Sequence, residues 1–443
     1  MESLLAPCAR TLLSQRRAPD TISVRLAFLG VTIDRRRFLK RSGLGAVGTV
    51  AALTGAGGCV ADAVARQPGA ERDATLAAVA FEGVHQAGIL TPAPPAASFA
   101  ALDVLAGDRA GLAELLRTIT ARARFLTAGG LPARRGSQSP PSDSGTLGPD
   151  VPPDALTVTL GVSSTLFDDR FGLAARRPLR LTDMRAFPND ALVPQWLGGD
   201  MMLQLCAGSG DTVLHALRDI TRHTHGVMRV RWRMDGSLSP PRPSGVPRNH
   251  LGFMDGIANP AVQDLKVADR LLWVVEGQGE PAWAVGGSYH VVRLIRMDIE
   301  AWDALPLHSQ ETTIGRYRAD GAPLGMARYT DVPDYAKDPH GYKVPLGAHI
   351  RLANPRTTTT EPSRIYRRGY NYDLGTDANG NLDMGLIFNC FQQDLLRQFE
   401  ATQKRLKNEN LANYISPFGG GFFFVLPGVR HARDWLGRGL VQA

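Results

Sequence analysis

Short runs of alternating apolar and polar residues predict β-strands along this chain, because successive strand side chains point to opposite faces of a sheet. Apolar residues at helical spacing predict amphipathic helices between some of these strands. The predicted strands are 74–90, which enters a loop, 155–168, 201–208 and 227–236. The predicted helices are 99–126 and 212–223. This order of elements indicates a ferredoxin-like α+β half.

A second unit repeats this plan toward the C-terminus. A strand and a helix are predicted within 286–315, another strand and helix within 383–406, and a closing strand at 419–429. Residues 236–250 contain many Pro, Gly and Ser and interrupt all periodicity, so they mark a boundary. The sequence therefore predicts an α+β protein with two ferredoxin-like halves, of the dimeric α+β barrel type, and domains at 66–240 and 241–443. A Pro/Gly/Ser-rich surface loop is predicted at 128–154.

The positive charge of the chain is concentrated near its N-terminus. The 443 residues carry a formal net charge of +8, but residues 1–65 hold nine Lys/Arg and four Asp/Glu, leaving 41 against 38 for the remainder. A basic surface that binds nucleic acid is therefore not expected.

Residues 1–65 are expected to be an export signal. Arg35 and Arg36 precede a weakly apolar, glycine-rich run from Gly43 to Gly58, which is too short and too rich in glycine to span a membrane comfortably. This order resembles a twin-arginine signal, whose machinery exports folded proteins to the periplasm, the cell envelope or the exterior. The alternative is a basic amphipathic linker. We expect translation to begin near Val31, so that residues 1–30 do not belong to the natural protein.

The cysteines do not indicate a metal cage. Cys8 and Cys59 lie in the expected signal, where Cys59 is also a candidate for lipidation, and no Cys/His cluster has zinc-site spacing. Cys206 and Cys390 are expected to be buried free thiols.

Asp255 is the first candidate for chemistry, in the stretch "GFMDGIANP" (252–260). Gly252 and Gly256 let the backbone turn freely and let a flat ligand approach without meeting a Cβ atom. The alternative is a turn in which the Asp side chain binds its own backbone.

His349 is the second candidate, in "VPLGAHIRLANPR". An imidazole that coordinates haem iron needs an apolar surface beside it, and nearby cations such as Arg351 and Arg356 can neutralise the propionates. The alternative is a surface-loop histidine with ordinary partners. Arg367, in the strand-like "RIYRRGYNYD", is the third candidate, although arginines beside tyrosines often only stack on a solvated face.

These three segments, in this order, resemble those of the dye-decolorizing peroxidases, and in particular the exported deferrochelatase/peroxidase branch. "GFMDG" fits the family's GxxDG motif, "AHIRLANPR" fits the axial-histidine segment and "RRGYNY" fits the distal arginine strand. The resemblance extends from about residue 75 to the C-terminus and implies one b-type haem per chain, bound in the C-terminal half.

The resemblance also implies roles for single residues. His349 would be the axial ligand of the iron, with Glu409 as the acceptor on its other ring nitrogen, although Asn408 and Asn410 flank Glu409 in the matching segment. Asp255 would take a proton from hydrogen peroxide and return it to the leaving oxygen, and Arg367 would stabilise the developing negative charge. Since a carboxylate remains a base in acid, an acidic optimum for dye oxidation is predicted. The remaining haem contacts would be Gly256, Ile257, Ala258, Asn354, Pro355 and Arg356, with Arg351 serving the same end.

Three functions stay open at this point. The first is an exported haem peroxidase that uses hydrogen peroxide to oxidise phenols and dyes. The second is a haem-handling deferrochelatase that releases iron from haem, working with iron-uptake partner proteins. The third is a non-catalytic α+β binding module. A homo-oligomer is also possible.

Overall fold

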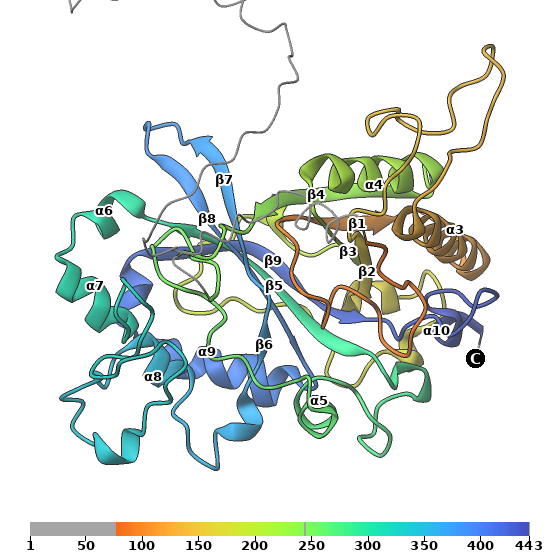
Figure 1. Cartoon of the computed structure of the whole chain (residues 1–443). Helices are drawn as coiled ribbons and strands as arrows, with labels where there is room; N and C mark the ends of the chain where they lie inside the picture. Colours follow the sequence, from red (N-terminus) through yellow and green to blue (C-terminus); the bar gives the residue numbers. More distant parts are fainter. Residues whose placement is uncertain (1–76, 243–244, 443) are drawn as a thin grey trace, which may run out of the picture. The chain divides into compact units, whose positions relative to one another are not determined.

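The computed structural model describes residues 77–242 and 245–442 (Figure 1). The predicted export signal at 1–65, with Cys59 and the expected start near Val31, lies outside the described residues.

The N-terminal half has the predicted ferredoxin-like order. Its four antiparallel strands lie in the order β4-β1-β3-β2, and two helices pack on their outer face. The elements are β1 (Ala96–Val104), α3 (Arg109–Ala128), β2 (Thr157–Val162), β3 (Met201–Ala207), α4 (Gly210–His223) and β4 (Met228–Ser237).

The C-terminal half repeats this order as β7-β8-β5-β9. Its long connections carry the short helices that will form the site, and the two-residue strand β6 adds to β8. The strands are β5 (Ser288–Met297), β6 (Tyr366–Arg367), β7 (Tyr370–Thr376), β8 (Leu382–Gln392) and β9 (Ile415–Val425). The helices are α5 (Leu265–Leu271), α6 (Ile299–Asp303), α7 (Leu307–Ile314), α8 (His349–Ala353), a wide π turn (Leu395–Glu400) continuing into α9 (Ala401–Leu406), and α10 (Arg438–Gln442).

The two halves close into one barrel of eight strands. β2 pairs with β9 through Val162 and Phe424, and β4 pairs with β7 through Ser237 and Asn371. Because β5 also pairs with β8, the strand order returns to its start. The predicted α+β class with two ferredoxin-like halves is confirmed.

Most of the sheet is buried on both faces, but β4 has exposed residues on its outer face and the end of β7 is exposed. Phe99, Trp232 and Tyr370 belong to the core inside the barrel, while Leu102 and Leu203 pack outward beneath the helices. Helix α3 begins at Arg109 because the Asp108 side chain accepts the Gly111 N–H at 2.8 Å. It ends at Gly129, whose φ of 72° favours glycine. No helix in the described residues is long and apolar enough to cross a membrane.

Some predicted elements differ from the structure. Residues 77–90 form no strand and make only an isolated bridge between Glu82 and Val429. The side-chain amide of Gln86 in this segment binds the backbone of Leu160 and Leu426. The first strand is instead β1, whose residues 99–104 fall within the predicted helix at 99–126. The helix predicted within 286–315 forms as two short helices, α6 and α7, and the other predicted strands and helices are confirmed apart from their ends. Cys206 and Cys390 are buried free thiols, as predicted.

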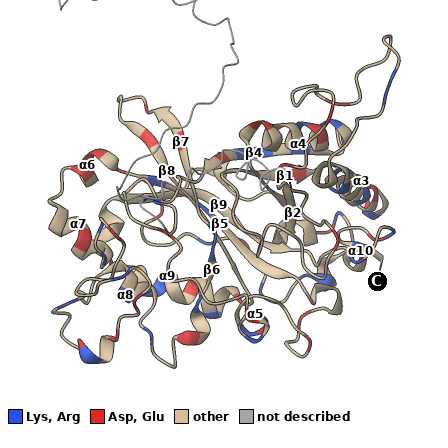
Figure 2. Ribbon diagram, viewed as in Figure 1, with Lys and Arg blue, Asp and Glu red and all other residues tan. Residues whose placement is uncertain are grey.

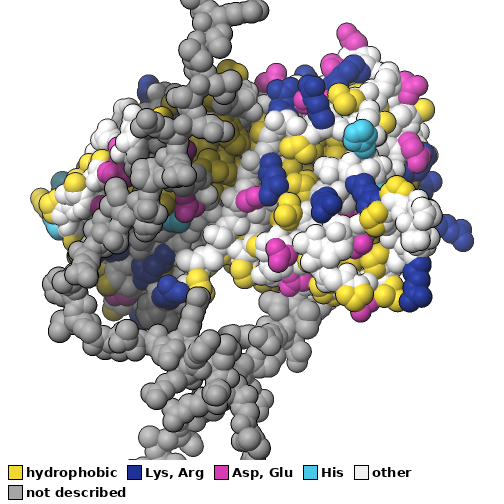
Figure 3. All heavy atoms as spheres, turned by 90° about the horizontal axis from the view of Figure 1, so that it is seen from above, with side chains coloured by type: hydrophobic (Ala, Val, Ile, Leu, Met, Phe, Trp, Pro, Cys, Tyr) yellow, Lys and Arg dark blue, Asp and Glu magenta, His cyan; other side chains and the backbone are white. Residues whose placement is uncertain are grey.

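Charges of both signs are interspersed over the described elements (Figures 2 and 3). This distribution agrees with the small net charge that the sequence assigns to this part of the chain.

Candidate active site

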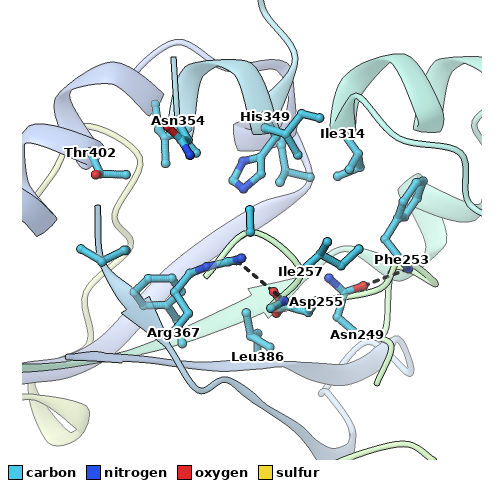
Figure 4. Close-up of a pocket in the computed structure, with 18 of the residues that line it drawn as sticks. Asn249, Phe253, Asp255, Ile257, Ile314, His349, Asn354, Arg367, Leu386 and Thr402 are labelled. Carbon is cyan, nitrogen blue, oxygen red and sulfur yellow. Dashed lines mark hydrogen bonds and ion pairs between the residues drawn. The ribbon is translucent and has the colours of Figure 1, made fainter. Parts of the chain in front are cut away.

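An apolar cavity lies on the outer face of β5 and β8, beneath α7, α8 and α9 (Figure 4). Its walls come from segments far apart in the sequence, so the C-terminal half forms it only when folded. The apolar lining includes Leu251, Phe253, Ile257, Ile295, Met297, Ile314, Ile350, Leu386, Phe388, Phe399, Leu406 and Leu411.

His349 begins α8 and points into this cavity (Figure 4). Its Nδ1 lies 2.6 Å from Oε2 of Glu409, a carboxylate that is almost fully buried. Burial alone would lower the pKa of His349, but the charge and the hydrogen bond of Glu409 outweigh it and raise this pKa above the usual range. Since Glu409 occupies Nδ1, the other ring nitrogen, Nε2, is the one available on the cavity side.

Asp255 and Arg367 face His349 from the opposite wall (Figure 4). Arg367 Nη1 donates to Asp255 Oδ1 at 2.9 Å, and the backbone N–H of Gly256 donates to the same oxygen at 2.6 Å. Within the described part of the chain, Asp255 Oδ2 accepts no hydrogen bond. Both side chains keep 26% of their surface exposed, so the pair can meet a small molecule that enters the cavity.

The backbone conformation of the loop that carries Asp255 requires glycine on both sides of this residue. Gly252 and Gly256 both have φ of 86°, in the left-handed region that other residues rarely adopt. The Asn259 side chain donates to the Arg367 carbonyl and accepts the Arg367 N–H, at 2.8 and 3.0 Å. This clamp fixes the two distal residues to each other. The predicted turn does form, since Asp255 binds its own loop, but the same carboxylate also holds Arg367.

Arginines gather at one end of the cavity. Arg356 and Arg364 line it, and the Nε atom of each is buried without a hydrogen-bond partner in the described structure. Arg316 lies nearby, and burial first, then the charge of Arg356, lowers the pKa of Arg316 to about 10. Buried donors without acceptors and crowded positive charges indicate a site for an anionic group.

These features fit a haem. The cavity offers an imidazole on one side, a proton acceptor and a guanidinium on the other, apolar walls between them, and arginines at the end where propionates would lie.

The structure brings most of the predicted residues together. Asp255, Gly256, Ile257, Ala258, His349, Asn354, Arg356 and Arg367 all line the cavity, and Glu409 lies directly behind His349. Pro355 is not among the lining residues.

Arg351 does not reach the predicted position. It donates from Nη1 to Val344 O at 2.8 Å and pairs with Asp338, so it anchors the loop before α8 instead of facing a propionate. As a residue of α8 only two positions after His349, it leaves the helix in a different direction.

Several residues that line the cavity were not predicted from the sequence. Arg316, Phe399 and Thr402 belong to no motif quoted from the sequence, and Arg364 was given no role. Arg364 is the first residue of the quoted segment "RIYRRGYNYD", in which only Arg367 was a candidate. Arg316 gave no signal, because only the fold brings its connection to the cavity.

Comparison with known proteins decides the family. Residues 86–237 match the N-terminal part of the Dyp-type peroxidases, and residues 246–430 match the C-terminal part. The chain belongs to the Dyp-type peroxidase family. The predicted resemblance is confirmed, and the chain is a haem peroxidase of this family.

Known proteins are similar to this chain over most of its length. A deferrochelatase from Escherichia coli O6:K15:H31 is 50% identical over 418 residues, which cover 92% of this chain and 97% of that protein. The crystal structure of a DyP-type peroxidase from Cellulomonas bogoriensis is similar with a TM-score of 0.74 and 36% identity, covering 83% of this chain and 99% of that one. Ferric DtpA from Streptomyces lividans has a TM-score of 0.75 and 34% identity, with coverage of 83% and 98%.

Proposed function

We propose that this peroxidase holds haem iron through Nε2 of His349 and acts on hydrogen peroxide with Asp255 and Arg367. The observation that carries the proposal is the geometry of the cavity: the His349–Glu409 pair and the Asp255–Arg367 pair face each other across apolar walls.

Glu409 sets the state of the axial histidine. Its carboxylate accepts the Nδ1 proton of His349, which fixes the tautomer, orients the ring and makes Nε2 a stronger donor to a metal. The haem, when bound, supplies the redox centre at which the O–O bond of peroxide breaks.

Asp255 and Arg367 divide the work on peroxide. Asp255 Oδ1 is held by Arg367 and Gly256, so Oδ2 is the oxygen that takes a proton from one peroxide oxygen and returns it to the leaving oxygen. Arg367, which stays charged throughout, stabilises the negative charge that develops during this transfer.

The test is haem reconstitution followed by peroxide mixing. His349→Ala is expected to lose haem binding, while Asp255→Asn is expected to keep haem but consume peroxide roughly 10²–10⁴ times more slowly. The exposed His431→Ala serves as a matched control and should behave like the wild type. If Asp255→Asn consumed peroxide at the wild-type rate, the assignment of the proton carrier would be wrong.

We also propose export by the twin-arginine route, with a final place in the periplasm, the cell envelope or the exterior. The support is the order of Arg35, Arg36 and the glycine-rich run at 43–58. Replacing both arginines by lysine should leave the protein in the cytoplasm, as cell fractionation would measure. Unchanged export of this variant would contradict the proposal.

Deferrochelation is a second candidate function, favoured by the name of relatives that are 50% identical. In this function the iron of haem is the product, and iron-uptake proteins are the expected partners. Incubation of the holoprotein with a reductant and an iron chelator should release iron and leave metal-free porphyrin, detected by its fluorescence. A haem that stays intact under these conditions would exclude this activity.

A further inference from the structure

A shallow depression on the surface touches the apolar cavity from outside. Asn354 and Arg356 line both spaces. These two residues therefore form a wall that the cavity and the depression share. The full lining of the depression is Arg270, Asn354, Arg356, Thr357, Thr358, Glu361 and Pro362.

The backbone of this wall is strained. Arg356 has φ of 59°, a left-handed conformation that a side chain with a Cβ atom adopts at a cost. Its N–H donates to the Asn354 side chain at 3.2 Å, which helps to hold this turn. Strain of this kind is kept where the position of a residue matters for function. Here it sets the Arg356 side chain in the wall between the two spaces.

The outer side of the depression carries an incompletely neutralised cation. Arg270 projects from α5 with 55% of its side chain exposed, and its nearest acid, Glu361, is 3.7 Å away. Glu361 lies closer to Arg364, at 3.1 Å, so its charge is shared between two arginines. A guanidinium in this state, beside the exposed hydroxyl-bearing residues Thr357 and Thr358, suits a carboxylate or sulfonate group.

We propose that this depression is the docking site for aromatic electron donors that carry an anionic group. The donor's acidic group binds Arg270, and its aromatic ring lies against the Asn354–Arg356 wall. The proposal rests on the peroxidase function above. Two phenol donors each lose one electron and the phenolic proton, and one hydrogen peroxide gains both electrons and both protons to become two waters. The donor does not need to enter the cavity.

The experiment compares three phenols of similar size and different charge: 4-hydroxyphenylacetate, the neutral tyrosol and the cationic tyramine. The variant is Arg270→Glu in the full-length holoprotein. KM for 4-hydroxyphenylacetate should rise about three- to tenfold, because the exposed attraction between Arg270 and the donor's carboxylate becomes a repulsion. KM for tyrosol should stay unchanged, and KM for tyramine should fall. Added salt should weaken the preference of the wild type for the anionic phenol.

The control variant is Arg433→Glu, which makes the same change of net charge at an exposed position near the C-terminus. It should leave all three KM values unchanged. Equal responses of the two variants, or an unchanged KM for 4-hydroxyphenylacetate in Arg270→Glu, would overturn the docking site. If Arg270→Glu affected all three phenols alike, charge recognition at Arg270 would also be refuted. A wild-type protein that binds no haem or consumes no peroxide would instead refute the function on which the site rests.

Discussion

At the scale of residues, the site depends on pairs that are remote in sequence. His349 and Glu409 are 60 positions apart, and Asp255 and Arg367 are 112 apart. Asp255 and Arg367 would both act on peroxide, whereas in the other pair His349 would hold the iron and Glu409 holds His349 in the required state. A change of Glu409 should therefore alter the reaction without emptying the cavity.

Glu409→Gln tests this division. The amide can still hold the ring of His349, but it carries no charge, so the ring nitrogen that faces the iron becomes a weaker donor. We expect haem to be retained, with peroxide consumption slowed roughly 10- to 100-fold. The absorption spectrum of the bound haem should shift as well. Loss of haem from this variant would show that Glu409 mainly supports structure.

The site residues that lie in contiguous motifs could be predicted from the sequence. Asp255, His349 and Arg367 each have informative neighbours, and Glu409 was selected by its place in a matching segment between two asparagines. Arg316 and Phe399 could not be found in this way, because their role arises from packing between distant segments. Arg351 was misplaced, since a basic residue near a ligand does not reveal the direction of its side chain.

At the scale of elements, the strands beneath the cavity pack so closely that one position on β8 has no space for a side chain. Gly385 on β8 lies against β5, and a Cβ atom placed there would come within 2.0 Å of Ile295 O and 2.8 Å of Tyr372 Cε1. The neighbouring Leu386 lines the cavity. The β5–β8 pairing thus positions the floor of the site and closes the barrel at the same time.

Gly385→Ala should therefore lower the free energy of unfolding by roughly 1–3 kcal/mol or more, because the clash involves a backbone oxygen. Gly107→Ala, at a position with no atom within 4 Å of the added methyl group, is the control and should change stability little. Chemical denaturation of both variants measures the difference. Similar midpoints for the two would contradict the described packing.

The first strand, β1, lacks the periodicity by which a strand is predicted. Every position of β1 from Ala97 to Val104 is buried, since one face meets the barrel interior and the other meets the helices. A strand buried on both faces shows no alternation, and its apolar run continued into the helical pattern of α3. By contrast, β4 alternates at Trp232, Arg233, Met234 and Asp235 and was correctly predicted.

At the scale of the whole molecule, the two halves share one hydrophobic core, and neither half has a complete core of its own. The largest buried cluster joins Leu102, Leu116 and Leu203 of the N-terminal half to Phe422 and Leu436 of the C-terminal half. The sheet is likewise completed only by the β2–β9 and β4–β7 pairings. The halves resemble each other in order of strands but depend on each other for burial.

Separate expression of residues 77–240 and 245–442 should therefore give insoluble or loosely packed products, because each fragment exposes strand edges and apolar surface. Co-expression should restore some soluble complex. Solubility and near-ultraviolet circular dichroism measure the outcome. A cooperative unfolding transition for the first fragment alone would show that it folds independently.

The buried His290 should make stability depend on pH. Burial lowers the pKa of His290 to about 4, despite its hydrogen bond with Asn389. Above pH 6.5 the ring is neutral in both folded and unfolded chains. Between pH 6.5 and about 4 only the unfolded chain takes up the proton, so stability falls as pH falls, by roughly 3 kcal/mol over the window, and this loss stops below it.

Urea unfolding of wild type and His290→Gln at pH 7, 5.5 and 4.5 isolates this contribution from that of the carboxylates. The variant should lose less stability on acidification than the wild type. Parallel losses would mean that His290 is protonated inside the folded protein.

Arg367, the last residue of β6, and Arg368, the residue after it, point in opposite directions. Arg367 enters the cavity, whereas Arg368 is buried and donates to the carbonyl of Thr91. Deletion of Gly369 would shift both arginines by one position relative to the rest of the sheet, and each shift by one residue turns a strand's side chains to the other face. The composition of the chain would hardly change, yet Arg367 would lose its contact with Asp255 and Arg368 its contact with Thr91. Spacing within this short segment is therefore under tighter constraint than the identity of its exposed residues.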